Sequence, residues 1–157
     1  MTEAQLFKPL SQTVLLVEDS PEDKEAIIRS FRKAGVDNSI HWCPDGDSAL
    51  DYLNHRGEYA GASKAPRPGI VLLDLNLPGT DGREVLREIK TSPDLRRIPV
   101  VVLTTSNAEG DVEACYDAGA NSFIQKPVNM VGFIAAIGQL KDYWFHIVLL
   151  PKNEDVT

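Results

Sequence analysis

Four short, largely apolar segments of the chain each lead into polar residues that could take part in chemistry. The segments are 14–17, 70–73, 100–103 and 122–125, and they are followed by Glu18 and Asp19, Asp74, Thr104 and Lys126. Short segments without strict alternation of apolar and polar residues are typical of strands buried on both faces of a parallel sheet. Ligands bind beyond the carboxyl ends of such strands. The three acids, the hydroxyl and the ammonium group are therefore expected to share one pocket.

The three acids predict a site for a divalent cation. Carboxylates at neighbouring strand ends repel one another unless a cation lies among them. Ligands that are all oxygen atoms favour a hard ion, so we expect Mg²⁺ (or Mn²⁺). The expected direct ligands are Asp19, Asp74 and the backbone carbonyl of Asn76, and Glu18 is expected to act through water or by fixing Asp19. The alternative is that Glu18 and Asp19 only cap the helix that follows them.

Asp74 is the best candidate for a nucleophile in this pocket. None of the three histidines adjoins one of these motifs, so Ser-His-Asp and Cys-His catalysis are unsupported. A carboxylate can itself attack phosphorus to give an acyl phosphate. Asp74 is preferred because its strand is expected to be the middle one of the set. Lys126 and Thr104 would then each contact a phosphoryl oxygen, although Lys126 could also be a surface lysine before a turn proline.

Signals for helices separate the predicted strands. Ser20 can cap a helix whose first residue is Pro21, and Gly35 can end that helix. Similar patterns predict helices after residue 45, after residue 82, over 109–118 and over 129–144, a second strand over 39–43, and a loop over 56–68. Strands that alternate with helices predict an α/β fold, a doubly wound five-stranded parallel sheet of the (βα)5 type. The expected domain covers 13–142, between an N-terminal arm, 1–12, and a C-terminal extension, 143–157.

Length and composition fit one domain. The chain has 157 residues, of which 43% are hydrophobic and 25% are charged, as in ordinary globular proteins. It contains no apolar run near the roughly 20 residues of a membrane span and no leader with a basic segment followed by an apolar one. Cys43 and Cys115 show neither metal-ligand spacing nor a disulfide framework. With a net charge of −7, the sequence predicts a cytoplasmic protein that binds neither a membrane nor nucleic acid.

Taken together, the motifs resemble the receiver domain of response regulators in two-component signalling. The matching residues are Val17-Glu18-Asp19, Leu73 to Pro78 with Asp81-Gly82, Pro99-Val100 with Thr104, Asp117 to Ala120, and Lys126-Pro127. The resemblance implies the flavodoxin-like receiver fold, phosphorylation of Asp74 by a phosphohistidine of a sensor histidine kinase, and dependence on a divalent metal. It also implies a switch in which Thr104 moves toward the phosphoryl group and Phe123 follows it inward. The alternative for Phe123 is simple core packing.

The end of the chain indicates a stand-alone regulator. After the last expected helix too few residues remain for an output domain, so the expected output is binding to other proteins. The most apolar stretch outside the repeat of strands and helices contains Tyr143, Trp144, Phe145, Leu149, Leu150 and Pro151. Because aromatic residues anchor interfaces, this stretch predicts a homodimer surface. Alternatively, it packs back onto its own domain.

A narrower resemblance concerns the stand-alone regulators of phytochrome histidine kinases. It rests on segments 73–78, 81–86 and 97–106 and on the ending from Trp144 to Pro151, and it implies a phytochrome as phosphodonor and a homodimer. Such a regulator is not an enzyme beyond its own phosphorylation and dephosphorylation. The alternative is a phosphate sink, or a shuttle to a histidine phosphotransfer protein, for a non-phytochrome kinase. A phosphatase with an aspartate nucleophile is disfavoured because Asn76 stands where such enzymes usually carry a second acid, and the complete pocket disfavours a non-signalling interaction module.

Overall fold

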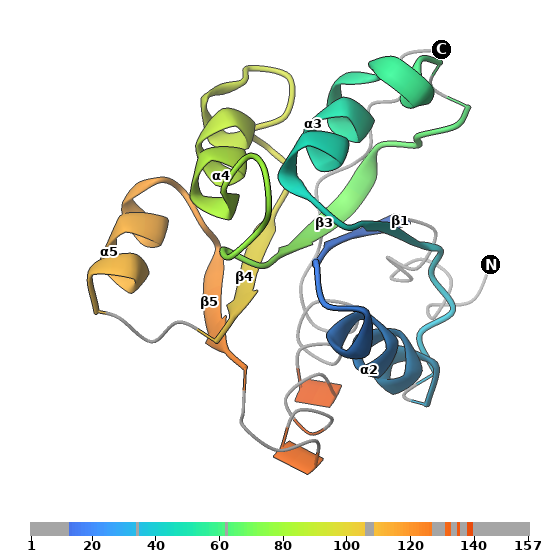
Figure 1. The fold of residues 1–157 in the computed structure, drawn as a ribbon, viewed down its shortest axis with the longest axis vertical. Coiled ribbons are helices and arrows are strands. Elements are labelled where there is room, and N and C mark those ends of the chain that lie inside the picture. Colours follow the sequence, from blue (N-terminus) through green and yellow to red (C-terminus); the bar gives the residue numbers. More distant parts are fainter. Residues whose placement is uncertain are drawn as a thin grey trace, which may run out of the picture.

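Five parallel strands form a single sheet in the order β2-β1-β3-β4-β5. Figure 1 labels β1, β3, β4 and β5 among them. The computed structural model describes residues 13–33, 35–61, 63–105 and 109–126, together with 131, 132, 135, 138 and 139. The strands are β1 (Thr13–Val17), β2 (Ile40–Cys43), β3 (Pro68–Leu73), β4 (Val100–Thr104) and β5 (Ser122–Gln125). The helices are α2 (Pro21–Lys33), α3 (Gly46–Asn54), α4 (Gly82–Thr91) and α5 (Glu109–Asp117), and η1 is a 3₁₀ turn over Gly57–Tyr59. The predicted doubly wound α/β sheet is confirmed.

Some predictions lie outside the described residues. The N-terminal arm, 1–12, and the C-terminal extension, 143–157, belong to this group, as does most of the helix predicted over 129–144. The boundaries predicted for the domain, 13–142, therefore stay predictions.

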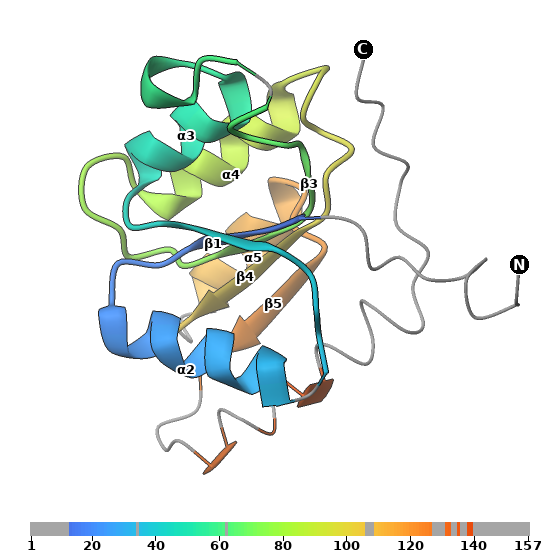
Figure 2. The same ribbon diagram turned by 90° about the vertical axis from the view of Figure 1, so that its right-hand side faces the viewer.

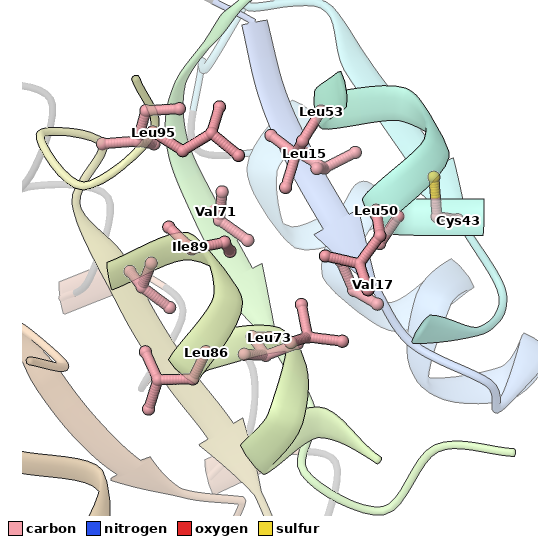
Figure 3. Packing of buried hydrophobic residues seen from close by; sticks show 14 of the residues in the cluster. Leu15, Val17, Cys43, Leu50, Leu53, Val71, Leu73, Leu86, Ile89 and Leu95 are labelled. Atoms are coloured by element: carbon pink, nitrogen blue, oxygen red, sulfur yellow. The ribbon is translucent and has the colours of Figure 1, made fainter. Parts of the chain in front are cut away.

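The sheet separates two apolar clusters, because successive side chains of a strand point to opposite faces. Helices α3 and α4 cover one face and α2 covers the other (Figure 2). The strand residues of the two clusters include Leu15, Val17, Val71, Leu73 and Val102 on the first face, and Val14, Leu16, Ile70, Leu72 and Val101 on the second. On the first face, Leu50 of α3 and Leu86 and Ile89 of α4 pack onto these strands (Figure 3). Both faces of the central strands are thus buried, which explains their continuous apolar sequence.

Both cysteines lie in the cluster beneath α3 and α4. They are free thiols, and each is buried. Burial raises the pKa of Cys43 to about 11 and also raises the pKa of Cys115.

Side-chain caps begin the helices close to the strand ends. The Ser20 hydroxyl accepts a hydrogen bond from the amide of Asp23 (3.2 Å) at the start of α2, and Gly35 follows this helix at φ +81°. Asp45 accepts from the amide of Ser48 (2.7 Å) at the start of α3. These bonds satisfy amides that have no partner within the helix. The predicted start and end of the first helix are confirmed.

Two glycines allow α3 and α4 to approach the loop that follows β3. A Cβ atom on Gly82 would lie 2.2 Å from the carbonyl oxygen of Asp74, and one on Gly46 would lie 2.1 Å from the carbonyl oxygen of Thr80. The amide of Gly82 also donates to the carbonyl of Leu75 (3.0 Å). The residues after Asp74 are therefore held by backbone contacts that leave no room for a side chain.

One element differs from the prediction. The segment 56–68, expected to be a loop throughout, contains the 3₁₀ turn η1, and its last residue, Pro68, begins β3. The turn is held by bonds from the amides of Tyr59 and Ala60 to the carbonyls of Arg56 and Gly57. Tyr59 packs against the cluster beneath α3 and α4, and this apolar contact outweighs the local signal from the glycines. In the part of the chain that the structure describes, no helix combines the length and the apolar character needed to cross a membrane.

Candidate functional site

The predicted pocket residues meet at the carboxyl edge of the sheet. Glu18 follows β1, Asp74 follows β3, Thr104 is the last residue of β4, and Lys126 follows β5. Backbone bonds extend the ladder to these positions, from the amide of Asp74 to the carbonyl of Val17 (3.0 Å) and from the amide of Lys126 to the carbonyl of Thr104 (2.8 Å). The chain adds β2 on one side of β1 and then β3 on the other, so the edge lies at the switch point where such sheets bind ligands.

The three acids form one group. Carboxylate oxygens of Glu18, Asp19 and Asp74 all lie within 4.8 Å of one another. Glu18 and Asp74 are buried, whereas Asp19 is exposed. Three negative charges at this spacing repel one another, and a hard divalent cation would relieve the repulsion with the oxygen ligands that it prefers. The donor set therefore fits Mg²⁺ or Mn²⁺.

Lys126 supplies a positive charge to this group. Its Nζ lies 2.5 Å from Glu18 Oε2, 2.8 Å from Asp23 Oδ2 and 3.6 Å from Asp74 Oδ2. The side chain of Lys126 is only 5% exposed, so these charges interact with little screening by solvent. Burial by itself would lower the pKa of Lys126, but hydrogen bonds with Asp23 and Glu18 and the charges of Glu18 and Asp74 raise it overall. Lys126 is thus an ammonium ion held beside the predicted nucleophile.

Burial has a large effect on the Glu18 carboxyl group. Burial raises the pKa of Glu18 to about 7, and the charge of Asp74 adds to this effect, while Lys126 opposes it. One oxygen of Glu18 accepts from the amide of Ser20 (3.1 Å) and the other accepts from Lys126. Glu18 is therefore a fixed carboxyl group whose charge needs a cation nearby.

Asp74 is held more loosely than Glu18. Its Oδ1 accepts a long bond from the amide of Asn76 (3.4 Å), and its Oδ2 is 3.6 Å from the Lys126 ammonium. The neighbouring Thr104 is fully buried. The carboxylate thus keeps lone pairs that can bind a cation or attack an electrophile.

Phe123 lies on β5 beside Val102 of β4. Its side chain is partly buried and packs against the cluster beneath α3 and α4, and its amide donates to the hydroxyl of Tyr116 (3.2 Å). Phe123 and Thr104 are therefore on neighbouring strands of the same half of the sheet. The six residues predicted as a dimer surface, from Tyr143 to Pro151, lie outside the described residues.

Two residues of the pocket were not predicted. In the sequence, Asp23 is only one of the acids expected in the first turn of α2. In the structure its carboxylate accepts a hydrogen bond from Lys126. Trp42 of β2 donates from its indole nitrogen to the carbonyl of Glu18 (2.7 Å), and the ammonium of Lys24 lies 4.3 Å from its ring centroid. No local signal separates Asp23 from Glu22, the other acid in the first turn of α2.

A comparison with protein families identifies the family of this chain. The model of the response regulator receiver domain matches residues 14–138, which is most of the chain. The chain belongs to the response-regulator receiver family. The predicted family and receiver fold are thereby confirmed.

Individual relatives agree with this assignment. Response regulator Rcp1 of Synechocystis is 42% identical over 140 residues, covering 89% of this chain and 93% of Rcp1. The probable methanogenesis regulatory protein FilR2 of Methanothrix harundinacea is 44% identical over 132 residues, covering 83% of this chain and 82% of FilR2. The Mn²⁺-bound structure of Rcp1 and that of the phosphorylated cyanobacterial phytochrome response regulator RcpA both match with a TM-score of 0.85. They are 42% and 40% identical, and each comparison covers 90% of this receiver and 99% of the other chain.

Proposed function

We propose that this receiver accepts a phosphoryl group on Asp74 from a phosphohistidine of a sensor histidine kinase. The observation that carries the proposal is the position of Asp74, at the end of the central strand, with an ammonium 3.6 Å from Oδ2 and two further carboxylates within 4.8 Å. An oxygen of Asp74 attacks phosphorus, the bond from phosphorus to the imidazole nitrogen breaks, and the imidazole keeps the electron pair. The product is an acyl phosphate on Asp74.

The surrounding residues have separate roles in this proposal. Glu18, Asp19 and Asp74, with the carbonyl of Asn76, hold Mg²⁺ or Mn²⁺, which would neutralise charge on the transferring group. Lys126 donates to one phosphoryl oxygen and the Thr104 hydroxyl to another. Two relatives of this receiver support the proposed metal site and the proposed phosphorylation, since Rcp1 has been solved with Mn²⁺ and RcpA in a phosphorylated form. The protein's only catalysis is of its own phosphorylation and dephosphorylation.

The test of the acceptor uses acetyl phosphate and Mg²⁺, with and without a chelator. We expect metal-dependent phosphate incorporation that hydroxylamine removes, and we expect Asp74→Asn to abolish it while the fold is kept. Asp37→Asn is the matched control, because Asp37 is an exposed aspartate between α2 and β2. Incorporation into Asp74→Asn at the wild-type level would show that the acceptor is another residue.

We further propose that phosphorylation is signalled through Thr104 and Phe123 to partner proteins. Phosphoryl-dependent contact of Thr104 would draw it toward Asp74 and let Phe123 turn inward, since the two residues lie on neighbouring strands. A contact of a few kcal/mol is enough to bias such a two-state element. Thr104→Ala should keep phosphorylation measurable but remove the chemical-shift changes at Phe123 in NMR spectra.

The proposed phosphodonor is a phytochrome histidine kinase. This proposal rests on the similarity to RcpA, which is a phytochrome response regulator. Phosphotransfer from an autophosphorylated phytochrome kinase, run beside a kinase of another class, would test it. Faster transfer from the unrelated kinase would contradict the choice of partner.

The proposed assembly is a cytoplasmic homodimer that binds no nucleic acid. Its interface is formed by Tyr143, Trp144, Phe145, Leu149, Leu150 and Pro151. The net charge of −7 and the two free thiols support the expected environment and partners. Truncation after Leu140 should weaken self-association in sedimentation velocity, and an unchanged proportion of dimer would remove this interface from the proposal.

A further inference from the structure

The ammonium of Lys126 is shared unequally among three carboxylates. Its Nζ is within hydrogen-bonding distance of Glu18 and Asp23 but lies 3.6 Å from Asp74 Oδ2, which is beyond an ordinary hydrogen bond. Glu18 and Asp74 already have roles in the proposed cation site. The second short contact of Lys126, 2.8 Å to Asp23 Oδ2, is made by a residue with no part in that site.

Asp23 is well placed to fix the ammonium. It lies in the first turn of α2, where its amide is bound to the Ser20 hydroxyl (3.2 Å). Its side chain is 38% exposed, whereas the side chains of Lys126 and Asp74 are 5% and 8% exposed. One partner of Lys126 thus belongs to the rigid start of a helix, outside the group of three acids.

We propose that Asp23 is a positioning residue that holds the Lys126 ammonium off Asp74 and so leaves Asp74 Oδ2 available to the divalent cation. The proposal rests on the proposed function of the same pocket, because it concerns the cation that assists phosphorylation of Asp74. Asp23 does not touch the cation or the phosphoryl group in this scheme. It acts through Lys126.

Loss of the Asp23 charge changes cation binding in one direction. Charge-assisted hydrogen bonds are about twice as strong as neutral ones, so Asp23→Asn weakens the pull on Lys126. The ammonium then moves toward Asp74 Oδ2, where it competes for the oxygen and places positive charge nearer the cation. The loss of one negative charge near the pocket weakens cation binding as well, and this general effect needs a control.

Glu22→Gln is the matched control. Glu22 is the exposed neighbour of Asp23 in the same first turn of α2, and its carboxylate accepts from the Ser20 hydroxyl (3.2 Å). Glutamine can accept the same bond. The substitution therefore removes one negative charge at the same end of the helix and leaves the contacts of Lys126 in place.

The experiment is a titration with Mg²⁺ by isothermal calorimetry in a double-mutant cycle. We expect Asp23→Asn to raise the Kd about three- to tenfold above that of Glu22→Gln, in the range found for groups in one charge network. With Lys126→Gln as background, Asp23→Asn should have no more effect than Glu22→Gln. Lys126→Met serves as a second background, and circular dichroism checks that each variant is folded.

Two results would overturn the positioning role. One is an equal Kd for Asp23→Asn and Glu22→Gln when Lys126 is present. The other is a full effect of Asp23→Asn after Lys126 is replaced, which would mean that Asp23 acts on the cation without it. These titrations use Mg²⁺ alone, so a wild-type protein that binds Mg²⁺ but incorporates no phosphate would contradict the proposed function and not the role of Asp23.

Discussion

Replacing Gly82 by alanine tests whether the backbone of the loop after Asp74 is as closely packed as the structure shows. The added Cβ would lie 2.2 Å from the carbonyl oxygen of Asp74 and 2.6 Å from Cα of Leu75. Both contacts are with backbone atoms, so no side chain can rotate away, and the gap must open to about 3.4 Å for ordinary contact. Overpacking of this kind costs about 1–3 kcal/mol and sometimes more. For a chain of this size, a loss of about 1–3 kcal/mol lowers the Tm by about 2–12 °C.

The same substitution at Gly110 is the control. Gly110 is in α5, and an added Cβ would meet nothing within 4 Å, so alanine there should leave stability unchanged or raise it by up to about 1 kcal/mol. Urea denaturation gives the free energy of unfolding of both variants, and acetyl phosphate labelling gives the rate of phosphate incorporation. Gly82→Ala should be slower to label, because the atom that the new Cβ displaces belongs to Asp74 itself. Equal stability of the two alanine variants would refute the close contact.

Four further results are expected. The affinity for Mg²⁺, measured by calorimetry, should rise from pH 5.5 to 7.5 because Glu18, with a pKa of about 7, must lose its proton, and Glu18→Gln should flatten this dependence. In the metal-free protein the same group makes the free energy of unfolding fall as pH rises between about 4.5 and 7, since its pKa is higher in the folded chain than in the unfolded one. Arg83 donates from Nε and Nη2 to the carboxylate of Asp111 (2.9 and 2.8 Å). A double-mutant cycle of Arg83→Gln and Asp111→Asn, measured by urea denaturation, should therefore show a coupling energy of about 0.5–1.5 kcal/mol, a value kept small by the partial exposure of both side chains. A coupling energy near zero would mean that the pair does not join α4 to α5. The emission of Trp42 should change on addition of Mg²⁺ in a Trp144→Phe variant, because its indole is bonded to the carbonyl of Glu18, and a constant emission would show that Glu18 does not move when the cation binds.

The strand ends were predictable for a general reason. Parallel strands bring their carboxyl ends to one edge, so the residues that follow apolar segments had to meet, as Asp74 and Lys126 do. The start of α2 was equally predictable from the sequence, because the capping residue Ser20 and the first residues of the helix are neighbours in the chain.

Contacts made by long side chains across the fold were not predictable in the same way. Asp23 and Lys126 are 103 positions apart, and the direction of the lysine side chain depends on the packing around it. The prediction of a loop throughout segment 56–68 was wrong for a related reason. The glycines of this segment indicate a loop, whereas the contact of Tyr59 with the apolar cluster, which favours the turn η1, depends on tertiary structure. Local signals identified the elements, and the unpredicted contacts came from packing between them.

The burial of Cys43 and Cys115 has a practical consequence. The chain has two cysteines, and both are buried with a raised pKa, so little of either is a thiolate at neutral pH and reagents reach them slowly. A cysteine introduced at an exposed position such as Asp37 would react first with maleimides. Dyes and spin labels can therefore be attached at chosen surface positions without removing either native cysteine from the core.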